Sequence, residues 1–159
     1  MMISRDVFAE TNPAFYGAVF AQFCSAYQAT RSGAVPAAAL VYLVVPLAIS
    51  EDLAPTFDGC NRETGFTLWM GRNPKVSVDL AKKVNSTLEV TTAAIHFGCI
   101  AGILKLTPDG GIEGTRKTLP TVVTTGVASA ALKRARLLGI WMAGMGSPRS
   151  VLEALGVSV

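Results

Sequence analysis

The sequence predicts a mainly α-helical protein with a small β-hairpin, in which a winged-helix-like centre is flanked by N-terminal and C-terminal helices. Polar side chains directly before proline favour helix starts, because the first can cap a helix and the second suits its first turn. Three dipeptides have this form: Asn12-Pro13, Asn73-Pro74 and Ser147-Pro148. Residues 104–112 alternate apolar and polar side chains around the turn sequence PDGG, which is typical of a hairpin. The length of 159 residues fits one domain, residues 1–159.

Residues 10–50 are expected to form a pair of helices. In the first helix, Phe15, Val19 and Phe23 recur at helical spacing after the cap. The second is the uncharged stretch AVPAAALVYLVVPLAIS, residues 34–50. We expect residues 36–49 to form a helix buried against the first one, with any remaining apolar surface facing a partner subunit.

The same uncharged stretch does not predict a membrane span. Its apolar run covers 16 residues, 34 to 49, whereas a spanning helix needs about 20. Pro46 would kink or end a helix within the run, and no lysine or arginine closely follows it to set an orientation. We therefore expect a core or interface helix and no contact with a membrane.

Residues 63–117 have the element order of a winged helix, which is three helices followed by a two-stranded wing. The first short helix places Phe66, Trp69 and Met70 on one face. Ser86 and Glu89 form a predicted capping box at the start of the third helix, residues 87–102. Helix-plus-hairpin arrangements also arise without any relationship to winged helices, so this remains a match of pattern.

Residues 120–157 are expected to form the C-terminal helices. A long helical pattern covers about residues 122–145, with Leu138, Trp141 and Met145 on its apolar stripe. A short helix follows Ser147 and stops at Gly156.

The motifs of common catalytic and cofactor sites are missing from the sequence. It contains no GxxxxGK[ST] phosphate loop and no GxSxG elbow. His96 is the single histidine and lies mid-helix, where a structural role is commoner than a catalytic one. The cysteines Cys24, Cys60 and Cys99 are far apart and form no CxxC motif. We therefore expect reduced thiols in a cytoplasmic protein that is not an enzyme, with no catalytic residues, no metal and no cofactor.

The charge pattern allows only weak, non-specific contact with DNA. The formal net charge is +3, and candidate phosphate contacts are Lys82, Lys83, Arg116 and Lys117, which ordinary solvated faces would explain as well. The helix at 87–102 contains Glu89 and no Arg, Lys, Asn or Gln, although major-groove readout depends heavily on those side chains. If this is a winged helix, we expect it to be adapted to bind protein.

Charged residues make up 16% of the chain, against about 25% in ordinary soluble domains. Either a partner protein covers some apolar surface, or the chain is an unusually well-buried compact domain. Composition alone leaves both interpretations open.

Four segments of the sequence resemble the middle component of bacterial ABC three-component systems. They read NPAFYGAVFAQFCSAYQ, VPAAALVYLVVPLAIS, TGFTLWMGRNPKVSVDLAKKV and GSPRSVLEALGV. The similarity extends over about residues 10 to 157 and lies in the whole-chain pattern, because none of these segments is a catalytic motif.

The resemblance implies a non-catalytic subunit that links an SMC/Rad50-like ABC ATPase to an effector subunit such as a nuclease. Such systems, to which the Lamassu systems are similar, are expected to act in defence against phage and plasmids. Candidate partner-binding residues are Phe15, Leu40, Leu43, Val44, Leu47 and Trp69. The first alternative is a DNA-binding winged-helix transcriptional regulator, followed by a membrane-associated subunit and by an unrecognised enzyme.

Overall fold

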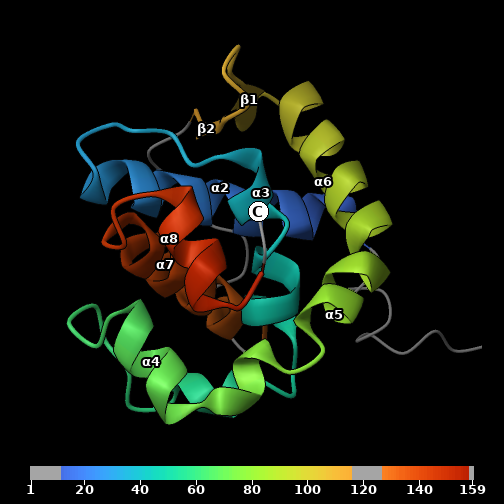
Figure 1. Ribbon diagram of the computed structural model, residues 1–159. Coiled ribbons are helices and arrows are strands. Elements are labelled where there is room, and N and C mark those ends of the chain that lie inside the picture. The colour runs from blue at the N-terminus through green and yellow to red at the C-terminus, as the bar shows by residue number, and fades with distance from the viewer. Residues whose placement is uncertain (1–11, 116–126, 158–159) are drawn as a thin grey trace, which may run out of the picture.

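Two long helices form the centre of the computed structural model, which describes residues 12–115 and 127–157. Helix α2 (Pro13–Thr30) and helix α7 (Val127–Ala143) make the most extensive contact between elements. The predicted cap of α2 is confirmed, because Asn12 Oδ1 accepts a hydrogen bond from the Ala14 amide at 3.0 Å. The other elements surround this pair (Figure 1).

The uncharged stretch is buried, as predicted, but it does not form one helix. It contains the short helix α3 (Ala38–Val41) and the π-helix η1 (Val45–Ile49). Pro46 explains the break, because it has no N–H to continue a regular helix and its ring crowds the preceding turn. The prediction of a helix packed on α2 is therefore wrong in part, since η1 packs mainly against α7 and α5.

Short helices follow η1 along the chain. Their bounds are η2 (Ala54–Phe57, 3₁₀), α4 (Phe66–Arg72), η3 (Pro74–Ser77, 3₁₀), α5 (Leu80–Ser86) and α6 (Leu88–Ile100). Two predicted caps in this region are wrong. Asn73 precedes η3 without capping it, because its side-chain amide donates to the Trp69 carbonyl at 2.9 Å, at the end of α4. Ser86 is the last residue of α5 and donates to the Lys83 carbonyl, so it does not begin α6.

The predicted hairpin is confirmed as strands β1 (Leu104–Leu106) and β2 (Ile112–Gly114), which pair antiparallel. Leu104 and Ile112 are buried, whereas Leu106 is 58% exposed. The hairpin is attached to the rest of the molecule. The Gly114 amide donates to Gln28 Oε1 on α2 at 2.8 Å, and the Ile112 amide donates to the Pro36 carbonyl at 3.0 Å.

The winged-helix arrangement is not confirmed, although the element order is present. Helix α6 and strand β2 pack on α2, whereas α4 packs on α7. Figure 1 shows α4 and the hairpin at opposite ends of the molecule. The three short helices therefore contribute to a core centred on α2 and α7 instead of forming one of their own.

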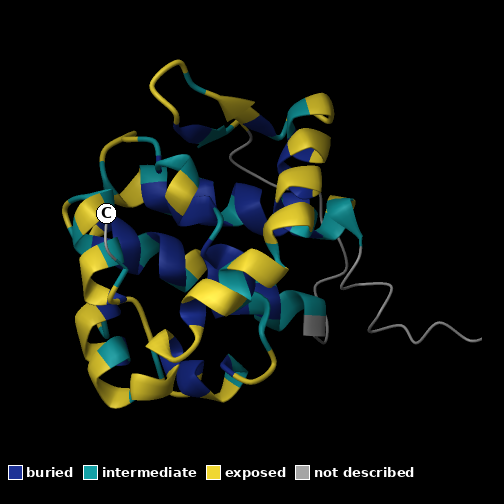
Figure 2. Cartoon of the chain, turned by 45° about the vertical axis from the view of Figure 1, so that its right-hand side comes forward, coloured by how far each residue is buried: buried dark blue, intermediate teal, exposed yellow. Residues whose placement is uncertain are grey.

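One cluster of buried side chains runs from Tyr16 to Leu155 and draws on all three predicted regions. In Figure 2 the central helices are mostly buried, and exposed residues lie on the outer sides of the peripheral elements. Helix α8 (Pro148–Ala154) closes the chain with the predicted cap, since Ser147 Oγ accepts from the Ser150 amide at 3.1 Å. No helix among the described residues combines the length and apolar character needed to cross a membrane.

Candidate functional site

Five of the six predicted partner-binding residues lie in the core of this chain. Their exposed fractions are 0% for Leu40, Val44, Leu47 and Trp69, and 4% for Leu43. Phe15 is partly buried and packs beside Tyr16, with ring centroids 5.7 Å apart. Helices α2, α5 and α7 cover the apolar side chains of residues 40–47 within this chain, and a partner-binding role for the six residues stays a prediction.

Two of the four predicted phosphate contacts, Lys82 and Lys83, lie in the described part of the chain, on α5. Lys82 is exposed, but Lys83 Nζ lies 3.9 Å from Asp52 Oδ2 and so has an acidic neighbour. Arg116 and Lys117 lie outside the described residues. His96 is exposed on α6, and no group of three His, Cys, Asp or Glu residues within 12–115 and 127–157 could hold a metal ion.

Exposed apolar side chains do gather on the outer side of α6 and on β1. We call this surface the α6 face and define it by Ala93, Phe97, Ile100 and Leu106. Ile100 is 88% exposed and Leu106 is 58% exposed. The opposite side of α6, with Thr91, Ala94, Ile95 and Gly98, is buried and packs on α2. The helix is therefore fixed in place with Ala93, Phe97 and Ile100 toward solvent, beside the exposed polar residues Glu89, Thr92 and His96.

The lack of charge on α6 was readable from the sequence, and it is the reason why protein binding was expected there. Between residues 88 and 102 the only formally charged side chain is Glu89. A solvent-facing helix normally carries polar and charged residues on its outer side. On α6 the exposed Glu89 is the only such charge, and an outer side with so little charge is more typical of a surface that a partner covers.

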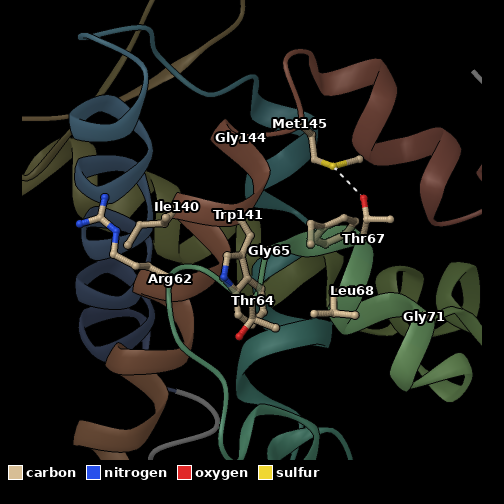
Figure 3. A pocket seen from close by; sticks show the side chains of 11 residues that line it. Arg62, Thr64, Gly65, Thr67, Leu68, Gly71, Ile140, Trp141, Gly144 and Met145 are labelled. Atoms are coloured by element: carbon tan, nitrogen blue, oxygen red, sulfur yellow. Dashed lines mark hydrogen bonds between the residues drawn. The ribbon is translucent and has the colours of Figure 1, made fainter.

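A second apolar surface lies between α4 and α7, and we call it the α4–α7 groove. It is an open depression of about 540 Å³ (Figure 3). Helix α4 contributes Thr67, Leu68 and Gly71 to its wall, and α7 and the residues after it contribute Ile140 and Met145. Thr67 Oγ1 donates to Met145 Sδ at 3.6 Å across the two walls.

The floor of the groove is a cluster of packed aromatic rings. Trp141 and Phe66 line it and are each 2% exposed. Trp141 stacks on Phe57 with ring centroids 5.8 Å apart and planes 4° from parallel, and its centroid lies 5.5 Å from that of Trp69. The indole N–H of Trp69 donates to Thr56 Oγ1 at 3.1 Å. Such packing leaves the floor little freedom to move.

Asn61 orders the loop that leads into the groove. Its carbonyl oxygen accepts from the indole N–H of Trp141 at 3.0 Å. Its side-chain Oδ1 accepts from the amides of Glu63 at 3.0 Å and Thr64 at 3.1 Å, which is an Asx turn. This turn holds Arg62 at the edge of the groove, where the arginine lines it.

Sequence reasoning missed this groove. Its walls come from segments about 75 residues apart, and no periodic pattern links them. Leu68 is the one residue with a local signal, since it falls outside the face shared by Phe66, Trp69 and Met70 and is 46% exposed.

Residues 3–159 match the family described as ABC-three component (ABC-3C) system Middle Component 3. The chain belongs to this family. The resemblance noted in the sequence is thus confirmed across almost the whole length. No curated protein and no solved structure gives a significant match to this middle component. Its family description makes it one part of a multi-component system, which implies partner subunits.

Proposed function

We propose that this middle component is a non-catalytic bridging subunit that joins the ABC ATPase of its system to the effector. One of the two exposed apolar surfaces binds the ATPase and the other binds the effector. The complex acts in the cytoplasm in defence against phage or plasmids, as the family resemblance implies.

The observation that supports this proposal is the presence of two apolar surfaces at opposite ends of one core. The α6 face lies beside the hairpin, and the groove lies beside α4, at the other end of the molecule in Figure 1. Large apolar side chains left in water favour association, because burying one contributes about 1.5–3 kcal/mol. A subunit that binds two different partners needs two such surfaces that do not overlap.

The regulator alternative gains no specific support. Helix α6, which would enter a DNA groove, contains no Arg, Lys, Asn or Gln between Leu88 and Ile100. Strand β2 of the hairpin is hydrogen-bonded to α2. These features favour protein partners over base readout.

Co-purification of the three subunits tests the bridging role. One variant carries Ile100→Asp with Leu106→Asp on the α6 face, and the other carries Leu68→Asp in the groove. We expect each variant to lose one partner and retain the other. Val78→Asp is the matched control, because Val78 is an exposed apolar residue, 57% accessible, that belongs to neither surface.

Thermal melting of each variant accompanies the binding measurement. All four substituted positions are exposed, so the melting temperature should change little. Retention of both partners by both variants would overturn the proposal, as would loss of both partners by the Val78 control.

A further inference from the structure

One arginine lines the α4–α7 groove, and two more lie one helical turn from residues that line it. Arg62 lines it next to Ile140 (Figure 3). Arg136 lies one helical turn before Ile140 on α7, and Arg72 lies one turn after Leu68 on α4. Residues four apart share a face of a helix, so Arg62 and Arg136 belong to one end of the groove and Arg72 to the other.

These three arginines have no partner within the described parts of the chain. None of them makes an ion pair or a side-chain hydrogen bond there. The remaining described arginines do have partners: Arg31 with Tyr27, Arg134 with Ala48 and Arg149 with Glu153. One carboxylate, Glu63, is adjacent to Arg62 in the sequence but forms no salt bridge with it.

We propose that the α4–α7 groove binds a short segment of a partner subunit that carries apolar side chains in its middle and aspartate or glutamate at both ends. The inference rests on the proposed bridging function and names the chemistry of one partner. The apolar middle packs on Leu68, Ile140 and Met145. The acidic ends meet Arg62 with Arg136 at one end and Arg72 at the other.

The physical argument combines burial with charge complementarity. An apolar groove gains affinity by covering its exposed side chains. Arginine adds selectivity, because its planar guanidinium forms paired hydrogen bonds with a carboxylate. Cations at both ends also repel a basic segment, and this exclusion adds to the specificity that the attraction provides. The rigid aromatic floor lowers the ordering cost of binding, since it is already packed.

Two opposite charges at one position provide the sharpest test. Leu68→Asp and Leu68→Lys remove the same apolar side chain. The dissociation constant is measured between each purified variant and the partner subunit whose co-purification depends on Leu68. We expect Leu68→Asp to weaken binding about tenfold more than Leu68→Lys at roughly 0.1 M salt. The difference should shrink at about 1 M salt, where the Debye length falls to about 3 Å.

Each result of this comparison has a distinct meaning. Equal weakening by the two variants shows an interface without an acidic occupant, so the inference fails while the bridging proposal stands. Greater weakening by Leu68→Lys indicates a basic occupant and also overturns the inference. Wild-type binding by both variants removes the groove as an interface and contradicts the bridging proposal itself.

Photo-crosslinking identifies the segment directly. A benzophenone amino acid at position 68 is placed in the assembled complex, with the same group at position 78 as the control. We expect mass spectrometry to find a partner-subunit peptide with acidic residues on both sides of an apolar centre. A crosslink to a second copy of this chain, to a peptide without carboxylates, or at no higher yield than the control overturns the inference.

A charge exchange completes the test. Replacing Arg62, Arg72 and Arg136 with glutamate should weaken binding, and replacing the carboxylates of the crosslinked segment with lysine should restore it. Failure of the exchange to recover binding would show that these arginines do not face the segment.

Discussion

Gly139 sets how closely α2 and α7 approach each other. A Cβ atom at this position would lie 2.5 Å from the Phe23 carbonyl oxygen and 3.1 Å from the Ala26 Cβ. The first of these atoms belongs to the backbone, so the clash cannot be relieved by turning a side chain. The close contact between the two central helices therefore requires a residue without a Cβ atom at position 139.

Gly139→Ala is accordingly expected to lower the free energy of unfolding. Overpacking of this kind costs about 1–3 kcal/mol, which outweighs the gain in helix propensity of up to about 1 kcal/mol. Gly71→Ala is the matched control, because its new Cβ would meet nothing within 4 Å and α4 should become slightly more stable. Urea denaturation measures both, and equal stability of the two variants would contradict the close approach.

Cys24 is expected to be inert in the folded protein. Burial raises the pKa of the Cys24 thiol well above its usual range, and the thiolate is the form that reacts. Cys60 and Cys99 are only partly buried. A thiol reagent at pH 8 should therefore label these two first and reach Cys24 only in urea, as mass spectrometry of the labelled peptides can show. Labelling of native Cys24 as fast as Cys99 would contradict its burial.

Local sequence signals predicted some caps and failed at others for a physical reason. Asn12 and Ser147 cap their helices as expected. Asn73 has the same Asn-Pro pattern, but its side-chain amide donates a hydrogen bond to the Trp69 carbonyl instead. Ser86 has a capping-box pattern, yet α5 continues through it and its hydroxyl bonds within that helix. Competing hydrogen-bond partners, which the spacing of residues does not reveal, decided these two cases.

A hydrogen bond from Arg134 links α7 to the π-helix η1. The guanidinium Nε of Arg134 donates to the Ala48 carbonyl at 2.6 Å. Burial lowers the pKa of the Arg134 guanidinium from its usual range, and the nearby Asp58 opposes this shift. A hydrogen bond from a charged donor to a buried carbonyl is worth more than a neutral one.

Arg134→Met should therefore destabilise the protein by about 1–3 kcal/mol, because the buried Ala48 carbonyl loses a donor. Lys133→Met is the control on the same helix, since Lys133 is exposed and should change stability by less than about 0.5 kcal/mol. Chemical denaturation compares the two variants. If their midpoints coincide, the Arg134 contact does not stabilise the junction of η1 and α7.

The elements of the fold were more predictable than the surfaces they create. Periodicity and turn residues indicated the long helices and the hairpin, and the low charge of α6 led to the expectation of a protein-binding side, which stays a prediction. The groove was not predictable, because Leu68 and Met145 become neighbours only when α4 packs on α7. The apolar stretch at 34–50 was predicted to be buried, but the sequence could not tell that α7 and α5 would cover it.

The central part of the chain is expected to be unable to fold alone. Residues 63–117 would form a stable unit if they were an independent winged helix. Instead, α6 and β2 pack on α2, and α4 packs on α7, so the isolated segment would leave these faces in water. Circular dichroism of a 63–117 fragment should show little helix and no cooperative melting. A sharp thermal transition would support an independent winged-helix core after all.

The close crossing at Gly139 also fixes a distance. Helix α2 packs against α6 and the hairpin, and α7 packs against α4 and lines the groove, so both proposed binding surfaces rest on two helices in close backbone contact. The contact between α2 and α7 therefore sets the spacing between the α6 face and the groove. Because backbone atoms limit how closely α2 and α7 approach each other, repacking of side chains can change this spacing only a little.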